Sequence, residues 1–201
     1  MMDITAEALL GMMIGLGLSA ACGFRVFVPP LVVSIAAYAG HLELAEGFEW
    51  LGKHPALIAF GIAVGCEAAG YCIPWVDNAL DAVATPAAVV AGIVLSASMI
   101  TDVSPLVKWS FAVIAGGSAA GIFHTTTAIL RGGSTLTTGG LGNPLLATME
   151  MGGAVTVSIL AILVPALALF IVLGVIAFAI KKWIGDRRQL SQPPSPMTGA
   201  Q

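Results

Sequence analysis

Charged residues are scarce in this chain. They make up 9% of its 201 residues, whereas soluble proteins carry about 25%. A soluble fold needs polar side chains to cover its surface, and too few are present here. Hydrophobic residues make up 58% of the chain, and the mean hydropathy is +0.97. The sequence therefore predicts an integral membrane protein whose partner is the lipid bilayer. The small net charge of −3 offers no basic patch for nucleic acid.

Cysteines and catalytic motifs are also sparse. The three cysteines, Cys22, Cys66 and Cys72, lie in apolar stretches without the CxxC spacing of zinc and redox motifs. We interpret them as small buried hydrophobic side chains, and we expect no metal site built from them. The chain contains no phosphate loop, no HExxH and no Ser-His-Asp pattern. These absences argue against an enzyme, so we expect neither catalytic residues nor a cofactor.

Long apolar runs are what the chain has instead. A membrane-spanning helix needs about 20 mostly apolar residues. The first run is interrupted by Arg25 and by Pro29–Pro30, and the last should kink at Pro165. The expected fold is all-α and transmembrane, a single domain over residues 1–186 with about five spans and broken helices. The spans are predicted at 9–39, 55–74, 86–102, 107–130 and 154–180.

Two further segments are too polar to span a membrane. Residues 75–85 are expected to form a short amphipathic helix, with Asp77 and Asp81 together on one face. That pair is either a cation site or a solvated helix face. The tail, 187–201, has the composition of a disordered segment.

The distribution of basic residues predicts the orientation. Lys181, Lys182, Arg187 and Arg188 are half of the eight Lys and Arg residues, and such clusters stay on the cytoplasmic side of a membrane. The start of the chain, MMDITAE, has no Lys or Arg, so the first apolar run is expected to remain as a span. With five spans the protein would be a multi-pass protein of the bacterial inner membrane, with its C-terminus in the cytoplasm.

The two halves of the chain resemble each other at an offset of 99 residues. Between 17–42 and 116–141, eight positions are identical, including Phe24 with Phe123 and Gly40 with Gly139. The register places residues 9–74 on 108–173 and Arg25 on His124. Three predicted crossings separate the first span of each half, so we expect an inverted repeat, a common plan of secondary transporters with a site near the bilayer midplane.

The polar groups predicted at membrane depth are few. Arg25 lies at the first break, and a charge inside a span marks a functional path by default. The Gly/Ser/Thr-rich segment 132–143 is expected to be ordered, non-helical backbone buried in protein, leading to a helix that starts at Pro144 with Asn143 as its N-cap. Such a helix start binds anions. The candidate binding residues for an anion or a carboxylate-bearing solute are Arg25, His124, Arg131, Ser134, Thr135, Thr138 and Asn143.

Two carboxylates join this group. Glu67 and Glu150 either carry protons or coupling ions, or they pair with Arg25 to hold the broken helices. The first possibility predicts a small transporter or channel. The alternative is a non-transporting scaffold or assembly protein with the same polar residues in structural roles. The two differ in whether water reaches Arg25 and His124, and either could form a homo-oligomer.

Three stretches resemble a known family. They are GLSAACGFRVFVPPL near the start, IPWVDNALDAVATP in the middle and HTTTAILRGGSTLTTGGLGNPLLATME towards the end. Together they are similar to the bacterial membrane family called domain of unknown function 4126, over roughly residues 9–180. The resemblance implies a small polytopic membrane protein and implies nothing about a substrate.

Overall fold

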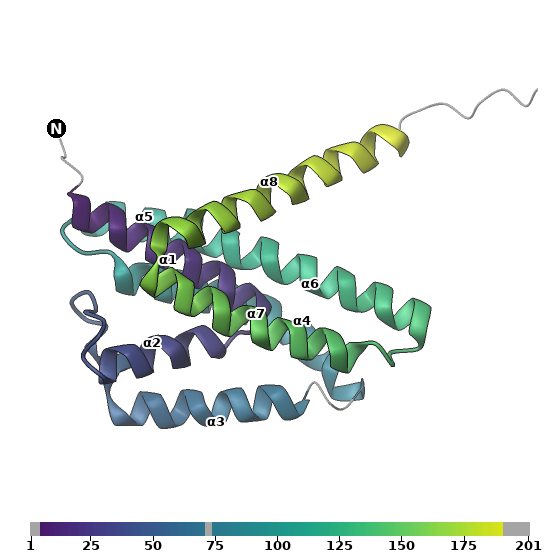
Figure 1. The fold of residues 1–201 in the computed structure, drawn as a ribbon, viewed down its shortest axis with the longest axis horizontal. Helices are drawn as coiled ribbons and strands as arrows, with labels where there is room; N and C mark the ends of the chain where they lie inside the picture. The colour runs from purple at the N-terminus through teal and green to yellow at the C-terminus, as the bar shows by residue number, and fades with distance from the viewer. Residues whose placement is uncertain (1–4, 71–73, 191–201) are drawn as a thin grey trace, which may run out of the picture.

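The chain folds into a bundle of helices (Figure 1). This structure, a computed structural model, describes residues 5–70 and 74–190, and those residues include no β-strand, so the predicted all-α class is confirmed. The helices are α1 (Ala6–Phe24), α2 (Val28–Tyr38), η1 (Glu49–Gly52), α3 (His54–Gly70), α4 (Pro74–Met99), α5 (Pro105–Phe111), η2 (Ala112–Gly116), α6 (Gly117–Thr138), α7 (Asn143–Leu163) and α8 (Pro165–Leu190).

Local sequence signals set several helix ends. The Thr5 hydroxyl accepts the N–H of Ala8 at 3.1 Å, and the Ser104 hydroxyl accepts that of Val107 at 3.4 Å. Both are side-chain N-caps, which satisfy a backbone donor that has no partner inside the helix. Proline lies in the first turn of α2, α5 and α7, where its missing N–H costs nothing.

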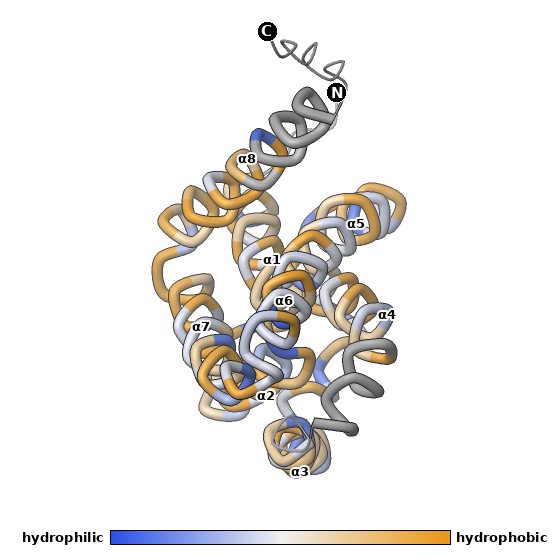
Figure 2. The backbone as a smooth tube through the Cα atoms, turned by 90° about the vertical axis from the view of Figure 1, so that its right-hand side faces the viewer, coloured by the Kyte–Doolittle hydropathy of each residue, from blue (hydrophilic) through white to orange (hydrophobic). Residues whose placement is uncertain are grey.

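The outer surface is apolar. Large hydrophobic side chains are exposed on α6, α7 and α8, and Figure 2 shows hydrophobic stretches along α7 and α8. In lipid such a surface is stable, whereas in water it would drive association. Among the described residues, three helical stretches are long and apolar enough to cross a membrane, Ala6–Phe24, Pro105–Thr138 and Asn143–Leu163. Four shorter apolar helices accompany them: Val28–Tyr38, His54–Gly70, Val83–Met99 and Pro165–Phe178.

The central helix is α1, which contacts α2, α4, α6, α7 and α8. Small residues recur on it every four positions, at Gly11, Gly15, Ser19 and Gly23. A Cβ on Gly15 would lie 2.9 Å from the Ser96 Cα of α4, and the Ser19 hydroxyl donates to the Gly92 carbonyl at 2.7 Å. Small residues let membrane helices approach this closely.

The break at Arg25 reverses the chain. Gly11 packs on Met99 at one end of α4, and Val26 packs on Ala84 and Ala88 towards the other. After α2 the chain returns to the Met99 end, because the Ala45 N–H donates to the Ser98 carbonyl at 2.8 Å. The predicted first span is therefore two helices of opposite direction. Similarly, the predicted fifth span separates at Val164 into α7 and α8, instead of kinking within one helix.

The prediction of an inverted repeat does not fit these directions. Ser19 contacts Gly116 and Gly23 contacts Ala120, so the repeat-related helices α1 and α6 run in parallel, as Figure 1 also shows. The reversal at Arg25 adds one change of helix direction that the predicted five spans do not include. The related residues do meet: the rings of Phe24 and Phe123 pack edge to face with centroids 5.3 Å apart.

The second half also lacks the break of the first. The helix formed by α5, η2 and α6 continues through His124 to Thr138, because Ala128 and Ile129 occupy the places of Pro29 and Pro30 in the register. Both segments end on a glycine with positive φ, Gly40 (74°) and Gly139 (65°). The register relates His124 to Arg25, but the helix break after Arg25 has no counterpart after His124.

The middle of the chain differs from its predicted division. Residues 75–85 and 86–102 are not a short helix followed by a separate span, since α4 runs unbroken through Pro86 and ends at Met99. A proline inside a membrane helix removes one backbone hydrogen bond but need not end the helix. The side chains of Asp77 and Asp81 lie outside the described residues, as does the tail after residue 190. Residues 187–190, predicted to be disordered, are the last turn of α8.

Candidate functional site

The Gly/Ser/Thr-rich segment forms a helical hairpin. Residues 132–138 are the end of α6, and only 139–142 form the turn to α7. Gly139 and Gly140 make that turn with φ of 65° and 89°, a conformation open to residues without a Cβ. The segment is mostly exposed. Our prediction of buried, non-helical backbone is therefore wrong, because seven consecutive residues without proline continue a helix whose glycines still make backbone hydrogen bonds.

The small polar residues of this segment close the hairpin. The Asn143 side-chain amide donates to the Thr135 hydroxyl at 3.1 Å. The Thr138 hydroxyl donates to the Ser134 carbonyl at 2.7 Å and accepts the Gly142 N–H at 3.1 Å. Asn143 is the first residue of α7 and not its N-cap. These contacts give Ser134, Thr135, Thr138 and Asn143 a structural role at the end of the hairpin.

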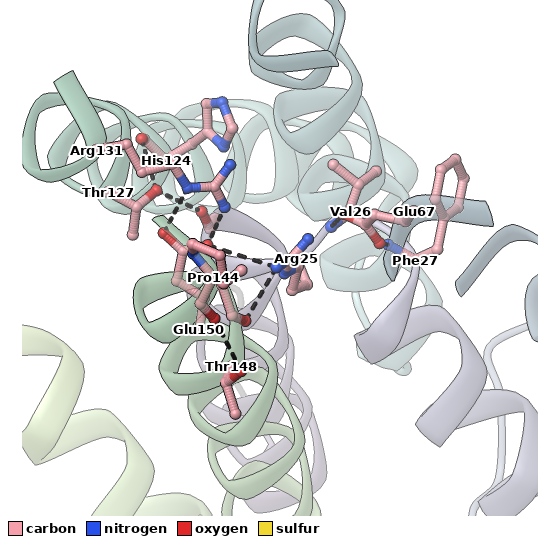
Figure 3. Close-up of polar contacts among 12 residues, drawn as sticks. Arg25, Val26, Phe27, Glu67, His124, Thr127, Arg131, Pro144, Thr148 and Glu150 are labelled. Atoms are coloured by element: carbon pink, nitrogen blue, oxygen red, sulfur yellow. Dashed lines mark hydrogen bonds and ion pairs between the residues drawn. The ribbon is translucent and has the colours of Figure 1, made fainter. Parts of the chain in front are cut away.

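Two arginines converge on Glu150 inside the bundle (Figure 3). Arg131 on α6 donates from Nε to Glu150 Oε1 at 3.0 Å and from Nη2 to Oε2. This is a bidentate contact, in which a planar guanidinium matches a planar carboxylate. Arg25 Nη2 lies 3.8 Å from the same Oε2. The three side chains are at most 8% exposed.

The break places Arg25 in this cluster. Arg25 has extended backbone between α1 and α2, so its side chain leaves the end of α1 towards α7. There Nη2 donates to the Ala147 carbonyl at 2.9 Å. Arg25 thus lies in the protein interior, with a carboxylate nearby. The Ala147 carbonyl is a partner that the sequence could not reveal, since a backbone acceptor leaves no signature in residue type.

Glu67 faces the other side of the break. Its carboxylate on α3 accepts the N–H of Val26 at 3.0 Å and that of Phe27 at 3.3 Å. These are donors at the start of α2, where the turn leaves no helical acceptor. In Figure 3, Arg25 lies between Glu150 and Glu67. Glu67 is therefore a cap for the broken backbone.

His124 lies two turns before Arg131 on the buried face of α6. It is 4% exposed, and its Nε2 has no hydrogen-bond partner among the residues that the structure describes. Its own carbonyl accepts the Thr127 hydroxyl at 2.9 Å, and the Gly23 carbonyl of α1 lies 3.5 Å from the same hydroxyl. Buried polar atoms nearly always have partners, so a single one without a partner in such a place deserves an explanation.

The charges of the cluster balance. Arg25 and Arg131 contribute two positive charges, Glu150 contributes one negative charge, and Glu67, which interacts electrostatically with both arginines, contributes the other. A buried charge without a counter-charge is costly. An additional anion can therefore be held between the arginines when one carboxylate gives up its charge. Among the described residues, no group of three His, Cys, Asp or Glu could hold a metal ion.

The chain matches the model of the family named domain of unknown function (DUF4126) over residues 12–184. It belongs to this family. The match covers Arg25, Glu67, His124, Arg131 and Glu150, so the whole cluster lies within the family's domain. Neither the curated proteins nor the solved structures contain a significant match to this chain.

Proposed function

We propose that this DUF4126 protein is a small membrane transporter or channel for anions, with its binding site at Arg25, Arg131 and His124. The observation that carries the proposal is the convergence of two buried arginines on a single carboxylate. On the same helix as Arg131 lies the buried imidazole of His124, whose Nε2 has no partner in the described part of the chain. Charged groups at membrane depth are costly to insert, by at least about 2.5–3.5 kcal/mol for arginine. A second arginine at one carboxylate is more than a simple ion pair requires.

In this proposal Glu150 is the coupling group, whereas Glu67 holds the break.

The proposed setting is the bacterial inner membrane with a cytoplasmic C-terminus. Successive helices alternate in direction, and α1 begins at the opposite end of the long axis from the end of α8 (Figure 1). Seven passes in place of the predicted five would keep the two ends on opposite sides, since both numbers are odd. The cluster of Lys181 and its basic neighbours supports placing the C-terminal end in the cytoplasm.

A structural role is the second candidate. It is favoured by the partners that Arg25 and Glu67 have in the interior, namely the Ala147 carbonyl and the N–H groups of Val26 and Phe27. In that case the cluster would only lock α2 and α7 to α1.

Two measurements distinguish these functions. An anion that binds the folded protein raises its melting temperature, so purified protein is heated in chloride, nitrate, phosphate and propionate. Tracer uptake into proteoliposomes is then measured for each anion that stabilises the protein. We expect binding and uptake by the wild type and by Glu46→Gln, an exposed control, and loss of both in Arg25→Gln. A stable protein without binding or uptake of any anion would favour the structural role.

A further inference from the structure

The carboxylate of Glu150 occupies the position that an anionic ligand would need. Arg131 offers Nε and Nη2 as two parallel donors, and Glu150 takes both. Arg25 lies at the same oxygen. An incoming anion can therefore accept hydrogen bonds from Nε and Nη2 of Arg131, the guanidinium fork, only after Glu150 has released them. Glu150 is, in chemical terms, a tethered carboxylate ligand at this site.

Because the cluster is buried, an anion can replace Glu150 at Arg131 only if a charge change accompanies the replacement. Glu150, Arg131 and Arg25 are all almost completely buried. If an anion entered and Glu150 kept its charge, two negative groups would compete for the same donors in a low-dielectric interior, where like charges repel strongly. A proton on Glu150 removes that repulsion. The proton adds to Glu150 Oε1 or Oε2, the ion pair with Arg131 is lost, and the ligand's oxygens form its replacement.

The geometry also restricts the ligand. A guanidinium fork matches a planar carboxylate with two oxygens on one side. A singly charged ligand replaces the single charge of Glu150, so the buried charge stays the same, whereas a doubly charged one would leave an unbalanced buried charge. We propose that the ligand is a small monocarboxylate, and that it binds at Arg131 and Arg25 in exchange for Glu150, which takes up one proton. This inference rests on the proposed function.

Other titratable groups surround Glu150 and must be separated from it. They are Arg25 at the break, Arg131 and His124 on α6, and Glu67 on α3, which interacts electrostatically with Arg25 and with Cys22 of α1. Protonation of His124 would also attract an anion at low pH. The variant His124→Gln removes that contribution and leaves Glu150 in place.

Calorimetric titration with sodium propionate tests the exchange on the full chain in lipid nanodiscs. Two buffers with different ionisation enthalpies give the number of protons taken up. For the wild type and for the exposed control Glu46→Gln, we expect uptake of about one proton and an affinity that rises about tenfold per unit fall in pH. His124→Gln alters the binding site itself, so its affinity should fall, but its proton uptake and the slope of its pH dependence should remain. In Glu150→Ala, propionate fills the space of the missing side chain, so we expect tighter, pH-independent binding without proton uptake.

Glu150→Ala leaves two buried arginines without their carboxylate and is expected to fold poorly. Propionate added during purification should then restore folding, and chloride should not. Glu150→Asp gives a second test in a protein that keeps the carboxylate. The shorter side chain should hold Arg131 less well, bind propionate more tightly than the wild type and keep the proton uptake.

The outcomes separate this inference from the proposed function. Proton uptake that persists in Glu150→Ala, failure of propionate to rescue that variant, or phosphate bound as well as propionate would overturn the exchange while leaving an anion site in place. Absence of binding by every anion, or propionate binding unchanged in Arg131→Gln, would overturn the anion site itself. Arg131→Lys keeps the positive charge but lacks the two parallel donors of the guanidinium. It should therefore weaken the binding of propionate more than the binding of chloride.

Discussion

The carboxylate of Glu67 accepts the backbone N–H of Val26 at 3.0 Å, across 41 positions of sequence. The same group accepts the N–H of Phe27. A turn between two helices inside a membrane exposes backbone donors that lipid cannot satisfy. Glu67 therefore explains how the chain can reverse at Arg25 so deep in the protein.

Loss of this cap should destabilise the fold in proportion to the acceptors removed. Glu67→Gln keeps one acceptor oxygen, whereas Glu67→Ala keeps none, and each buried donor left unpaired costs about 1–3 kcal/mol. We expect a lower melting temperature in detergent for Glu67→Gln and a larger decrease for Glu67→Ala. Glu46→Ala, on the exposed loop, is the control. Equal stability of Glu67→Ala and the wild type would show that water or other groups cap the break.

The glycines of the bundle should differ sharply in tolerance. A Cβ on Gly23 would lie 2.4 Å from the Phe123 Cβ and 2.7 Å from the Ala120 carbonyl oxygen. Overpacking of this kind costs about 1–3 kcal/mol, so Gly23→Ala should lower the melting temperature. Gly61 on α3 has nothing within 4 Å of its Cβ position, and Gly61→Ala should be neutral or stabilising by up to about 1 kcal/mol. If both variants melt together, α1 and α6 are not packed as described.

Composition and local signals sufficed for the class of fold and for part of the cluster. The scarcity of charge predicted apolar helices, and the two prolines after Arg25 predicted a break. The charge of Arg25 inside an apolar run marks a functional path, and its side chain is buried in the structure. Each of these inferences depends on the solvent around the chain or on a short stretch of residues. A single sequence is enough to infer either one.

The direction of the helices could not be predicted from the sequence in the same way. A break can kink a helix or reverse it, and the difference depends on Glu67, which is distant in sequence from Val26. The prediction of an inverted repeat omits this reversal, and in the structure α1 and α6 run parallel. The composition of segment 132–143 argues against a helix because glycine and threonine weaken helices in water. In lipid the unsatisfied backbone of any alternative costs more, so residues 132–138 continue α6.

The two ends of the chain should lie on opposite sides of the membrane. The reason is the alternation of helix direction from α1 to α8, and the basic cluster near Lys181 favours the cytoplasm for the C-terminus. Reporter fusions at each end, one active only in the periplasm and one only in the cytoplasm, measure this. A fusion after residue 46, in the loop between α2 and η1, should report the same side as the N-terminus. Both ends on one side would contradict the odd number of passes.

Charge counting predicts an unequal cost for the three members of the cluster. Glu150→Gln leaves two buried arginines without a carboxylate, and removing one partner from a buried pair costs about 3–5 kcal/mol. Arg131→Gln removes both bidentate hydrogen bonds and leaves Glu150 to Arg25 at 3.8 Å, so its cost should be intermediate. Arg25→Gln leaves the Arg131–Glu150 pair intact. It loses the bond to the Ala147 carbonyl, and such a bond is worth about 0.6 kcal/mol on average in a membrane protein. It also loses the electrostatic attraction of Arg25 for Glu150 and Glu67, so we expect the smallest cost of the three. Thermal unfolding in detergent measures the order of the three costs, with Lys53→Gln on the surface as the control.

If Arg25→Gln is as unstable as Arg131→Gln, Arg25 is a structural lock. If it is nearly as stable as the wild type, stability does not account for Arg25, and the anion site does.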